Sequence, residues 1–182
     1  VGLIKDYKKM ISMDLKEVDN LVLIIGKTEG HIDQSLFART ILDEKNGPPP
    51  EVNLFNEKNN GESILNLIDK GYVKSAHDIS LGGLLVAISK MCIKGNKGIK
   101  ISKSKNLINE IEYFFAEDQG RYLIEVNKDD LKEVTKILNK NSVHHEELGI
   151  ITQNDMIINE KTKVTIDELK SYYTNWLSKF MS

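Results

Sequence analysis

Polar side chains of the kinds that bind ligands stand where a predicted strand passes into a predicted helix. They are His77, Asp78 and Ser80, followed by the glycines Gly82 and Gly83. The strand is expected over Tyr72–Ala76, and an apolar helical run starts at Leu84. The first N–H groups of a helix have no partner within it and lie at the positive end of its dipole, so they attract phosphate and other anions. The segment therefore predicts an anion site, with a turn held only by packing as the alternative.

The order of these polar residues leaves two interpretations open. His77 and Asp78 are adjacent, so they form either a catalytic pair or a cap beside a surface imidazole. Together with Ser80 they do not make a hydrolase triad, because the three are sequence neighbours without a nucleophile elbow. The glycines also do not belong to a GxGxxG or GKS/GKT nucleotide loop. We assign no catalytic residue in this chain.

A second polar cluster lies between a predicted helix end and a predicted strand start. It comprises Glu117, Asp118, Gln119 and Arg121 around Gly120. Two carboxylates, an amide and a guanidinium can bind a polar ligand or a phosphate. The alternative is that they satisfy the backbone groups of their own turn.

The third candidate cluster stands at the start of a helix expected from about Asp33. Its polar side chains are those of His31, Gln34 and Ser35. Capping of the helix by Asp33, Gln34 or Ser35 is the preferred interpretation. The alternative is a loop that touches substrate or a partner half of a larger enzyme.

No metal site is expected. His144 and His145 fall in a predicted strand, where successive side chains point to opposite faces, and no third ligand follows at suitable spacing. Cys92 is the single cysteine, which excludes an intramolecular disulfide, and its apolar helical surroundings predict a packing role.

Length and composition indicate one globular domain over residues 1–182. Hydrophobic residues make up 40% and charged residues 29% of the chain, as in soluble proteins. The net charge of −2 gives no general basic character, so neither nucleic acid nor a membrane is expected as a partner. No transmembrane run or signal peptide is visible, and the cytoplasm is the expected compartment.

Hydrophobic periodicity alternates strands with helices. Strands are expected at 21–26, 72–76, 99–102, 121–126, 143–152 and 156–158, and helices from about 33, at 56–70, from 84, at 106–115, at 129–140 and after a capping box of Thr165 and Glu168. The apolar residues expected to face the core on the helix from about 33 are Leu36, Phe37, Ile41 and Leu42. On the helix at 56–70 they are Ile64, Leu65, Leu67 and Ile68. The pattern predicts an α/β (α+β) fold, a mixed β-sheet covered by helices.

Four ordered motifs resemble one family. His77–Leu84 (HDISLGGL) resembles the HD(V/I)SDGGL signature of phosphoribosylformylglycinamidine synthase, and Phe115–Tyr122 resembles its FGEDQGRY segment. Gly30–Phe37 with Gly47–Val52 resembles its GHLGQSLY and GPPPxVDL segments. Val1–Ile4 is similar to the start of the last domain of that enzyme, and the tail through Trp176 to its final helix.

The resemblance implies a C-terminal domain of the AIR synthase-related superfamily, cut from a longer synthetase. That enzyme converts formylglycinamide ribonucleotide, ATP and glutamine-derived ammonia into formylglycinamidine ribonucleotide in purine biosynthesis. ATP and magnesium would be bound mainly by earlier domains, and the partners would be those domains, a glutaminase subunit and a small bridging subunit. The fragment alone is expected to be inactive, with the 117–121 loop in an auxiliary, structural role.

Three positions depart from the family pattern. Leu81 replaces an acidic residue, Asp33 replaces a glycine in GHLGQS, and Ala116 replaces the glycine of FGED. These changes fall in the ligand loops and favour a rival hypothesis, a non-catalytic interaction module. A second rival is another enzyme of the superfamily, such as aminoimidazole ribonucleotide synthetase or selenophosphate synthetase, but its motifs differ at these places.

Overall fold

A computed structural model describes residues 3–4, 6–101 and 109–181 of the chain. Within them seven strands form one mixed sheet in the order β2-β4-β1-β5-β3-β6-β7. Their bounds are β1 Leu21–Ile25, β2 Val73–Asp78, β3 Gly98–Ile101, β4 Tyr122–Val126, β5 His145–Thr152, β6 Asp155–Ile158 and β7 Thr162–Thr165. Neighbours are antiparallel except β3 and β6, which are parallel. The predicted mixed sheet is confirmed.

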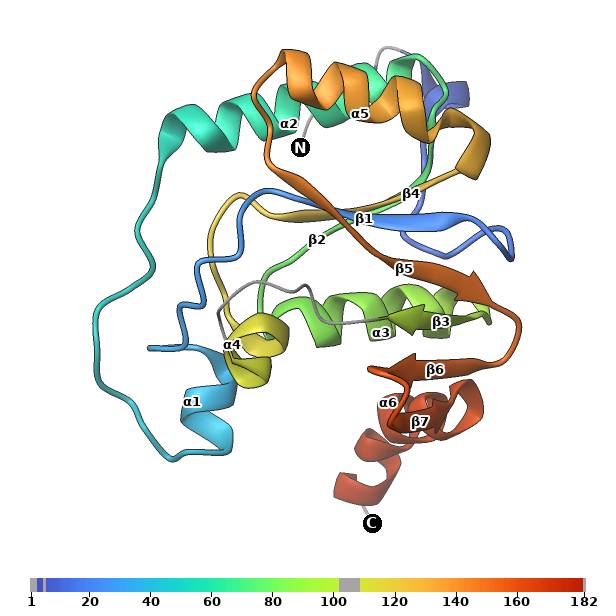
Figure 1. Cartoon of the computed structure of the whole chain (residues 1–182). Helices are drawn as coiled ribbons and strands as arrows, with labels where there is room; N and C mark the ends of the chain where they lie inside the picture. The colour runs from blue at the N-terminus through green and yellow to red at the C-terminus, as the bar shows by residue number, and fades with distance from the viewer. Residues whose placement is uncertain (1–2, 5, 102–108, 182) are drawn as a thin grey trace.

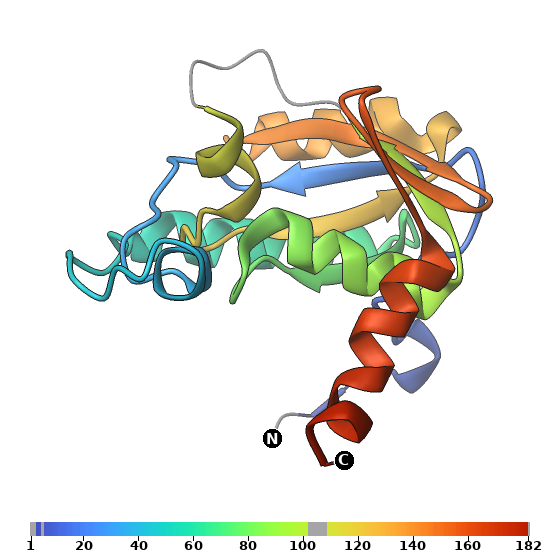
Figure 2. The same cartoon turned by 90° about the horizontal axis from the view of Figure 1, so that it is seen from below.

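Helices cover both faces of the sheet, as Figures 1 and 2 show. On one face lie α2 (Leu54–Asp69) and α5 (Leu131–Lys140), and on the other α3 (Gly83–Gly95), α4 (Glu110–Phe115) and α6 (Ile166–Met181). The short α1 (Leu36–Thr40) lies beside α4, where the rings of Phe37 and Phe115 stack 4.7 Å apart. Single 3₁₀ turns occur at Tyr7–Lys9 and Lys128–Asp130.

The central strand β1 is buried on both sides. Val22 and Ile24 belong to the core cluster under α3, whereas Leu21, Leu23 and Ile25 belong to the cluster under α2 and α5. This division follows from the period of two along a strand, and it explains why the run is apolar without alternation. The sheet therefore separates two cores and carries the candidate loops at one end.

A buried carboxylate ties the N-terminal segment to the sheet. Glu125 of β4 is fully buried, and its two oxygens accept hydrogen bonds from the N–H groups of Lys16 (2.8 Å) and Glu17 (3.0 Å). They also accept from the Asn20 amide at 2.7 Å and the Ser75 hydroxyl at 2.8 Å. Four donors satisfy a group whose burial would otherwise be costly.

Several local expectations were wrong. Leu65 is 66% exposed on α2, and Ile41 is 68% exposed because α1 ends at Thr40 and the chain leaves the core there. Leu42 is exposed for the same reason. The helix expected at 106–115 is described only from Glu110, and its first residues lie outside the described part of the chain, as do Ser102 and the start of the Val1–Ile4 match.

In the C-terminal region, one strand was missed and one predicted cap is present. Strand β7 was not predicted, because its sequence Thr-Lys-Val-Thr carries only one apolar residue. The Thr165 cap is present, since its hydroxyl oxygen accepts a hydrogen bond from the Glu168 N–H at 3.1 Å. Among the described residues, no helix combines the length and hydropathy that a membrane span requires.

Candidate functional site

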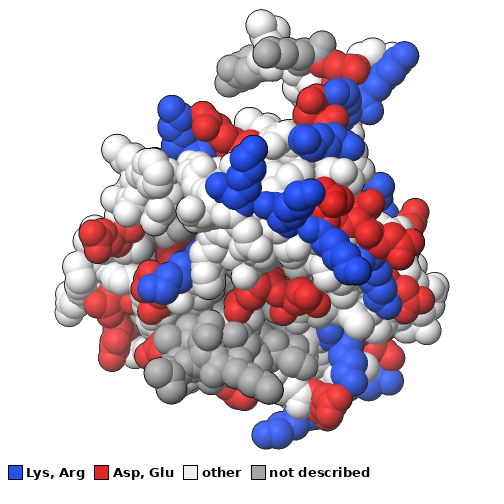
Figure 3. Space-filling model, turned by 45° about the horizontal axis from the view of Figure 1, so that its top comes forward, with Lys and Arg blue, Asp and Glu red and all other residues white. Residues whose placement is uncertain are grey.

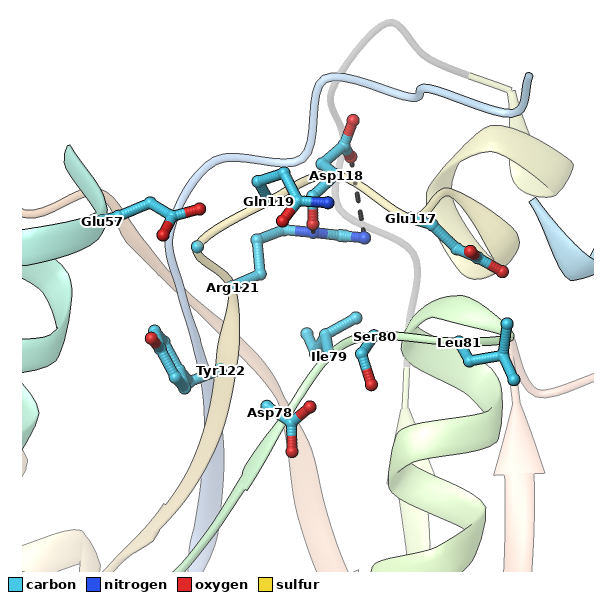
Figure 4. Close-up of a pocket in the computed structure, with 11 residues that line it drawn as sticks. Glu57, Asp78, Ile79, Ser80, Leu81, Glu117, Asp118, Gln119, Arg121 and Tyr122 are labelled. Atoms are coloured by element: carbon cyan, nitrogen blue, oxygen red, sulfur yellow. Dashed lines mark hydrogen bonds and ion pairs between the residues drawn. The ribbon is translucent and has the colours of Figure 1, made fainter. Parts of the chain in front are cut away.

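The three candidate clusters meet at one end of the sheet. The loop before β4 (residues 116–121) lies between the loop after β1 (27–35) and the turn between β2 and α3 (79–82), and hydrogen bonds join it to both. Figure 4 shows the side chains that line the space between these segments. The three clusters, which are far apart along the chain, therefore form one region of the molecule.

Glu117 occupies the start of α3. Its Oε1 accepts hydrogen bonds from the Gly82 N–H at 2.8 Å and from the Leu36 N–H at 2.7 Å. The Gly83 N–H donates to the Ser80 carbonyl at 2.9 Å. The start of the helix was expected to be bare, but the Gly82 N–H donates to a carboxylate from a distant segment and the Gly83 N–H to a carbonyl of its own turn.

Asp118 holds the loop after β1. One of its carboxylate oxygens accepts from the N–H groups of Glu29 (3.0 Å) and Gly30 (3.2 Å), and the other from His31 N–H at 3.0 Å. The Arg121 guanidinium lies 3.6 Å away, and both side chains are buried. Three N–H donors and one cation satisfy this carboxylate within the chain.

Arg121 is equally committed to internal partners. Besides Asp118, it donates to the Thr28 hydroxyl at 3.1 Å and to the Ala116 carbonyl at 2.5 Å. Burial lowers the pKa of Arg121 and Asp118 opposes that shift, but arginine stays charged in proteins. Its charge is matched by Asp118, and Figure 4 shows this contact as a dashed line.

The third cluster secures the loop that carries the three prolines. The Gln34 amide donates to the carbonyls of Lys45 (2.9 Å) and Gly47 (3.2 Å), and His31 Nε2 lies 3.0 Å from the Pro48 carbonyl. Ser35 is fully buried, and its hydroxyl accepts from the Ala38 N–H at 3.1 Å. The preferred expectation of a cap is confirmed for Ser35, although the helix begins at Leu36 and not near Asp33.

The His77–Asp78 pair is a hydrogen-bonded couple at the edge of the sheet. His77 Nδ1 lies 3.1 Å from Asp78 Oδ1, and the Ser80 hydroxyl hydrogen-bonds to the same carboxylate. Burial lowers the pKa of His77 in spite of Asp78. Burial acts to raise the pKa of Asp78, but the Ser80 hydroxyl and the His77 imidazole outweigh it, so this pKa lies below its usual value.

Two neighbouring cavities open between the loops. The smaller, of about 260 Å³, is lined by side chains that include Asp78, Ser80 and Tyr122. The larger, of about 650 Å³, is lined by α2 and by the loops after β1 and before β4. Glu57 of α2 and Gln119 border both. Sequence reasoning missed Glu57 and Tyr122 as lining residues. Glu57 stands in no motif, and only the packing of α2 brings it here (Figure 4). Tyr122 ends the Phe115–Tyr122 motif, but it was assigned to the strand that follows.

The smaller cavity does not fit a nucleotide with its metal. Glu57 and Asp78 place carboxylates on its wall, the guanidinium of Arg121 is paired, and the Gly82 N–H donates to Glu117. Nowhere in the described residues do three or more His, Cys, Asp or Glu side chains lie close enough to hold a metal ion, His144 and His145 included. A phosphate in the smaller cavity would meet these carboxylates, and no step through ATP or magnesium is assigned to residues of this chain.

The charges on the surface do not form a field of one sign on the face seen in Figure 3. Lysines and arginines lie there beside aspartates and glutamates. This distribution agrees with the net charge of −2.

Comparison with known proteins points to one family. A family model described as AIR synthase related protein, C-terminal domain, matches residues 17–159. Phosphoribosylformylglycinamidine synthase subunit PurL of Pelagibacter ubique is 66% identical over 181 residues, which cover 100% of this chain and 25% of the relative. The same subunit of Bartonella henselae is 36% identical over 181 residues, with 100% of this chain and 24% of the relative covered.

Solved structures show the same fold. Thermotoga maritima PurL complexed with FGAR superposes with a TM-score of 0.73 at 18% identity, over 90% of this chain and 30% of that chain. Escherichia coli HypE gives a TM-score of 0.61 at 16% identity, over 85% of this chain and 51% of that one. The chain spans about a quarter of the length of the curated relatives it matches.

Proposed function

This chain belongs to the AIR synthase related proteins, as their C-terminal domain, and we propose that it is the part of a phosphoribosylformylglycinamidine synthase that braces the catalytic region. The observation that carries the proposal is the 66% identity with the Pelagibacter ubique subunit, which extends over 181 residues and therefore includes all three candidate clusters. Residues 1–182 would form a single domain of that enzyme.

The whole enzyme would convert formylglycinamide ribonucleotide, ATP and glutamine-derived ammonia into formylglycinamidine ribonucleotide, ADP and phosphate. The ATP-binding and catalytic groups would lie in the rest of the polypeptide, because Glu117 and Asp118 already accept hydrogen bonds from backbone N–H groups of this chain. A structure of Thermotoga maritima PurLQS is among the structural relatives. By that analogy, the partners would be the other domains, a glutaminase subunit and a small bridging subunit, in the cytoplasm.

The contribution of this chain would be mechanical. Glu117 and Asp118 fix the loop after β1, and His31 and Gln34 of that loop fix the segment Lys45–Pro48. A rigid surface of this kind can hold a neighbouring domain in the geometry that catalysis requires. The same internal hydrogen bonds favour the second candidate, a scaffold in an assembly that has no ligase activity.

An exchange of domains tests the proposal. The matching quarter of Pelagibacter ubique PurL is replaced by these 182 residues, and amidine formation is measured with ammonia as the nitrogen donor. We expect the chimera to retain activity and the 182-residue chain alone to have none. A chimera that folds but forms no amidine, beside an active parental enzyme, would favour the scaffold. Amidine formation by the isolated chain would refute its assignment as a bracing domain.

A further inference from the structure

Asparagine followed by glycine occurs twice in the chain, and the structure places the two pairs in opposite surroundings. Asn46–Gly47 lies in the connection between α1 and α2, and Asn60–Gly61 lies inside α2. In such a pair the glycine has no side chain to shield its backbone nitrogen, which can reach the carboxamide carbon of the asparagine. Because glycine follows in both cases, a difference in reactivity between the two pairs has to come from the fold.

The first pair is open to solvent. Asn46 and Gly47 are both exposed and stand outside the helices and strands, in the loop that Figure 1 draws between α1 and α2. Within the described part of the chain, no group forms a hydrogen bond with the carboxamide of Asn46 or with the N–H of Gly47. The Asn46 carboxamide can therefore turn toward the following nitrogen without breaking a contact with the rest of the chain.

The second pair is protected at both reacting groups. Asn60 is only 7% exposed, and its side-chain amide donates to the Gly120 carbonyl at 2.9 Å. Gly61 stands beyond the first turn of α2, where the backbone N–H is used by the helix. Attack of the Gly61 nitrogen on Asn60 requires that this hydrogen bond breaks and that α2 opens locally. Asn60–Gly61 is therefore a control for the same chemistry within one molecule.

We propose that Asn46 is a site of spontaneous deamidation and that the product loosens the loop between α1 and α2. The deprotonated nitrogen of Gly47 attacks Cγ of Asn46, the N–Cγ bond forms, the Cγ–Nδ2 bond breaks, and Nδ2 takes up a proton and leaves as ammonia. Water then opens the resulting succinimide at either carbonyl, which gives aspartate or isoaspartate with a new carboxylate. Water is the only other reactant, and no step oxidises or reduces the chain.

The contacts of the loop give this reaction a structural consequence. The Gln34 side-chain amide donates to the carbonyls on both sides of Asn46, those of Lys45 (2.9 Å) and Gly47 (3.2 Å). Isoaspartate adds one carbon atom to the main chain between these two acceptors, so Gln34 can no longer reach both with good geometry.

The new charge acts in the same direction. It stands beside Gly47, at which a Cβ would lie 2.5 Å from the carboxylate of Asp33, so the product brings a second negative group toward that carboxylate. The inference depends on these contacts of the loop and not on the ligase reaction proposed above.

Peptide mass spectrometry of the aged 182-residue chain tests the proposal. Trypsin cuts after Lys45, Lys58 and Lys70, so the two pairs fall in separate peptides. During incubation of the folded chain at about 37 °C and pH 8, we expect aspartate and isoaspartate to accumulate at Asn46 at least about ten times faster than at Asn60. In concentrated urea, where α2 is unfolded, the two rates should become similar.

Two outcomes would overturn the assignment of Asn46. One is a folded chain in which Asn60 reacts as fast as Asn46. The other is a folded chain in which neither pair reacts although both react in urea, because this would show that the loop holds Asn46 away from the Gly47 nitrogen.

The NMR signals of the Gln34 side-chain amide test the structural consequence. In the aged chain, a second set of these signals should appear with an intensity that follows the fraction of isoaspartate. The matched control is Asn46→Gln, which keeps a carboxamide but would have to close a larger ring. This variant, aged in the same way, should show a single set and no acidic product at position 46. An isoaspartate fraction that leaves the Gln34 signals unchanged would refute the loosening of the loop.

Discussion

Removal of the Glu125 carboxylate should destabilise the fold severely. The change Glu125→Ala leaves four hydrogen-bond donors without their acceptor. Of these, the Asn20 amide and the Ser75 hydroxyl belong to buried residues, while the N–H groups of Lys16 and Glu17 belong to partly exposed ones and can turn to water. A buried donor left unsatisfied costs about 1–3 kcal/mol, so two of them cost about 4 kcal/mol together.

Urea unfolding of the chain, followed by circular dichroism, measures this cost. With a slope of about 2 kcal/mol per molar urea, a loss of about 4 kcal/mol lowers the midpoint by about 2 M. Glu125→Gln keeps one acceptor oxygen and should lose about half as much.

The matched control is Glu147→Ala, the same truncation at an exposed position of β5, which should change stability by less than about 0.5 kcal/mol. Hydrogen exchange should also accelerate at the N–H groups of Lys16 and Glu17 in Glu125→Ala. If this variant shifted the midpoint no more than Glu147→Ala, the reasoning that this carboxylate anchors the N-terminal segment would be refuted.

Three further predictions concern a glycine pair, the cysteine and a histidine. A Cβ on Gly98 would lie 2.0 Å from the Asp155 carbonyl oxygen, whereas a Cβ on Gly61 would have no neighbour within 4 Å. In urea unfolding, Gly98→Ala should therefore lower the free energy of unfolding by at least about 1–3 kcal/mol, and Gly61→Ala should raise it by about 0.5–1 kcal/mol. Equal effects of the two substitutions would contradict the packing. Burial raises the pKa of the Cys92 thiol to about 12 from a usual 9.0, so a thiol reagent at pH 8 should label it only on unfolding. The free energy of unfolding should fall as the pH rises above about 9, because the unfolded thiol loses its proton first. Rapid labelling of the folded chain would refute this. Burial lowers the pKa of His77 from 6.5, so the unfolded chain takes up a proton first as the pH falls. The free energy of unfolding should therefore decline below about pH 6.5, and His77→Gln should remove part of that decline. An NMR titration of the imidazole measures the pKa directly, and a value at or above 6.5 would contradict this prediction.

Most of the fold could be predicted from the sequence, because buried apolar residues recur with the period of a helix or a strand. The unbroken apolar run of β1 follows from its position between two cores, and the apolar stripe of α3 follows from packing on one face of the sheet. The errors occur where this hydrophobic pattern is weak. Leu65 is apolar but exposed on α2, and β7 pairs with β6 through its backbone although its side chains are mostly polar.

The sequence identified the three clusters one by one, but it did not show that they meet or which groups of the chain they bind. The sequence predicted an anion at the start of α3, but it could not show that the acceptor there is a carboxylate of this chain. Glu117 is 35 residues from Gly82 and 81 residues from Leu36, so no local pattern records either bond. His31 and Gln34 likewise hydrogen-bond to Pro48 and Lys45 of the next loop. Whether any of the candidate residues contacts a ligand in a larger enzyme stays a prediction.

Carboxylates of this chain accept hydrogen bonds from the backbone N–H groups of the loops that a ligand would otherwise use. The most direct test is a titration of the unmodified 182-residue chain with magnesium-ATP and with ADP, followed through the backbone amide resonances of Gly82, Gly83, Leu36 and His31. We expect no saturable shift at these four amides. A saturable shift at Gly82 and Leu36 would show that nucleotide displaces Glu117, and it would contradict the internal pairing of these loops.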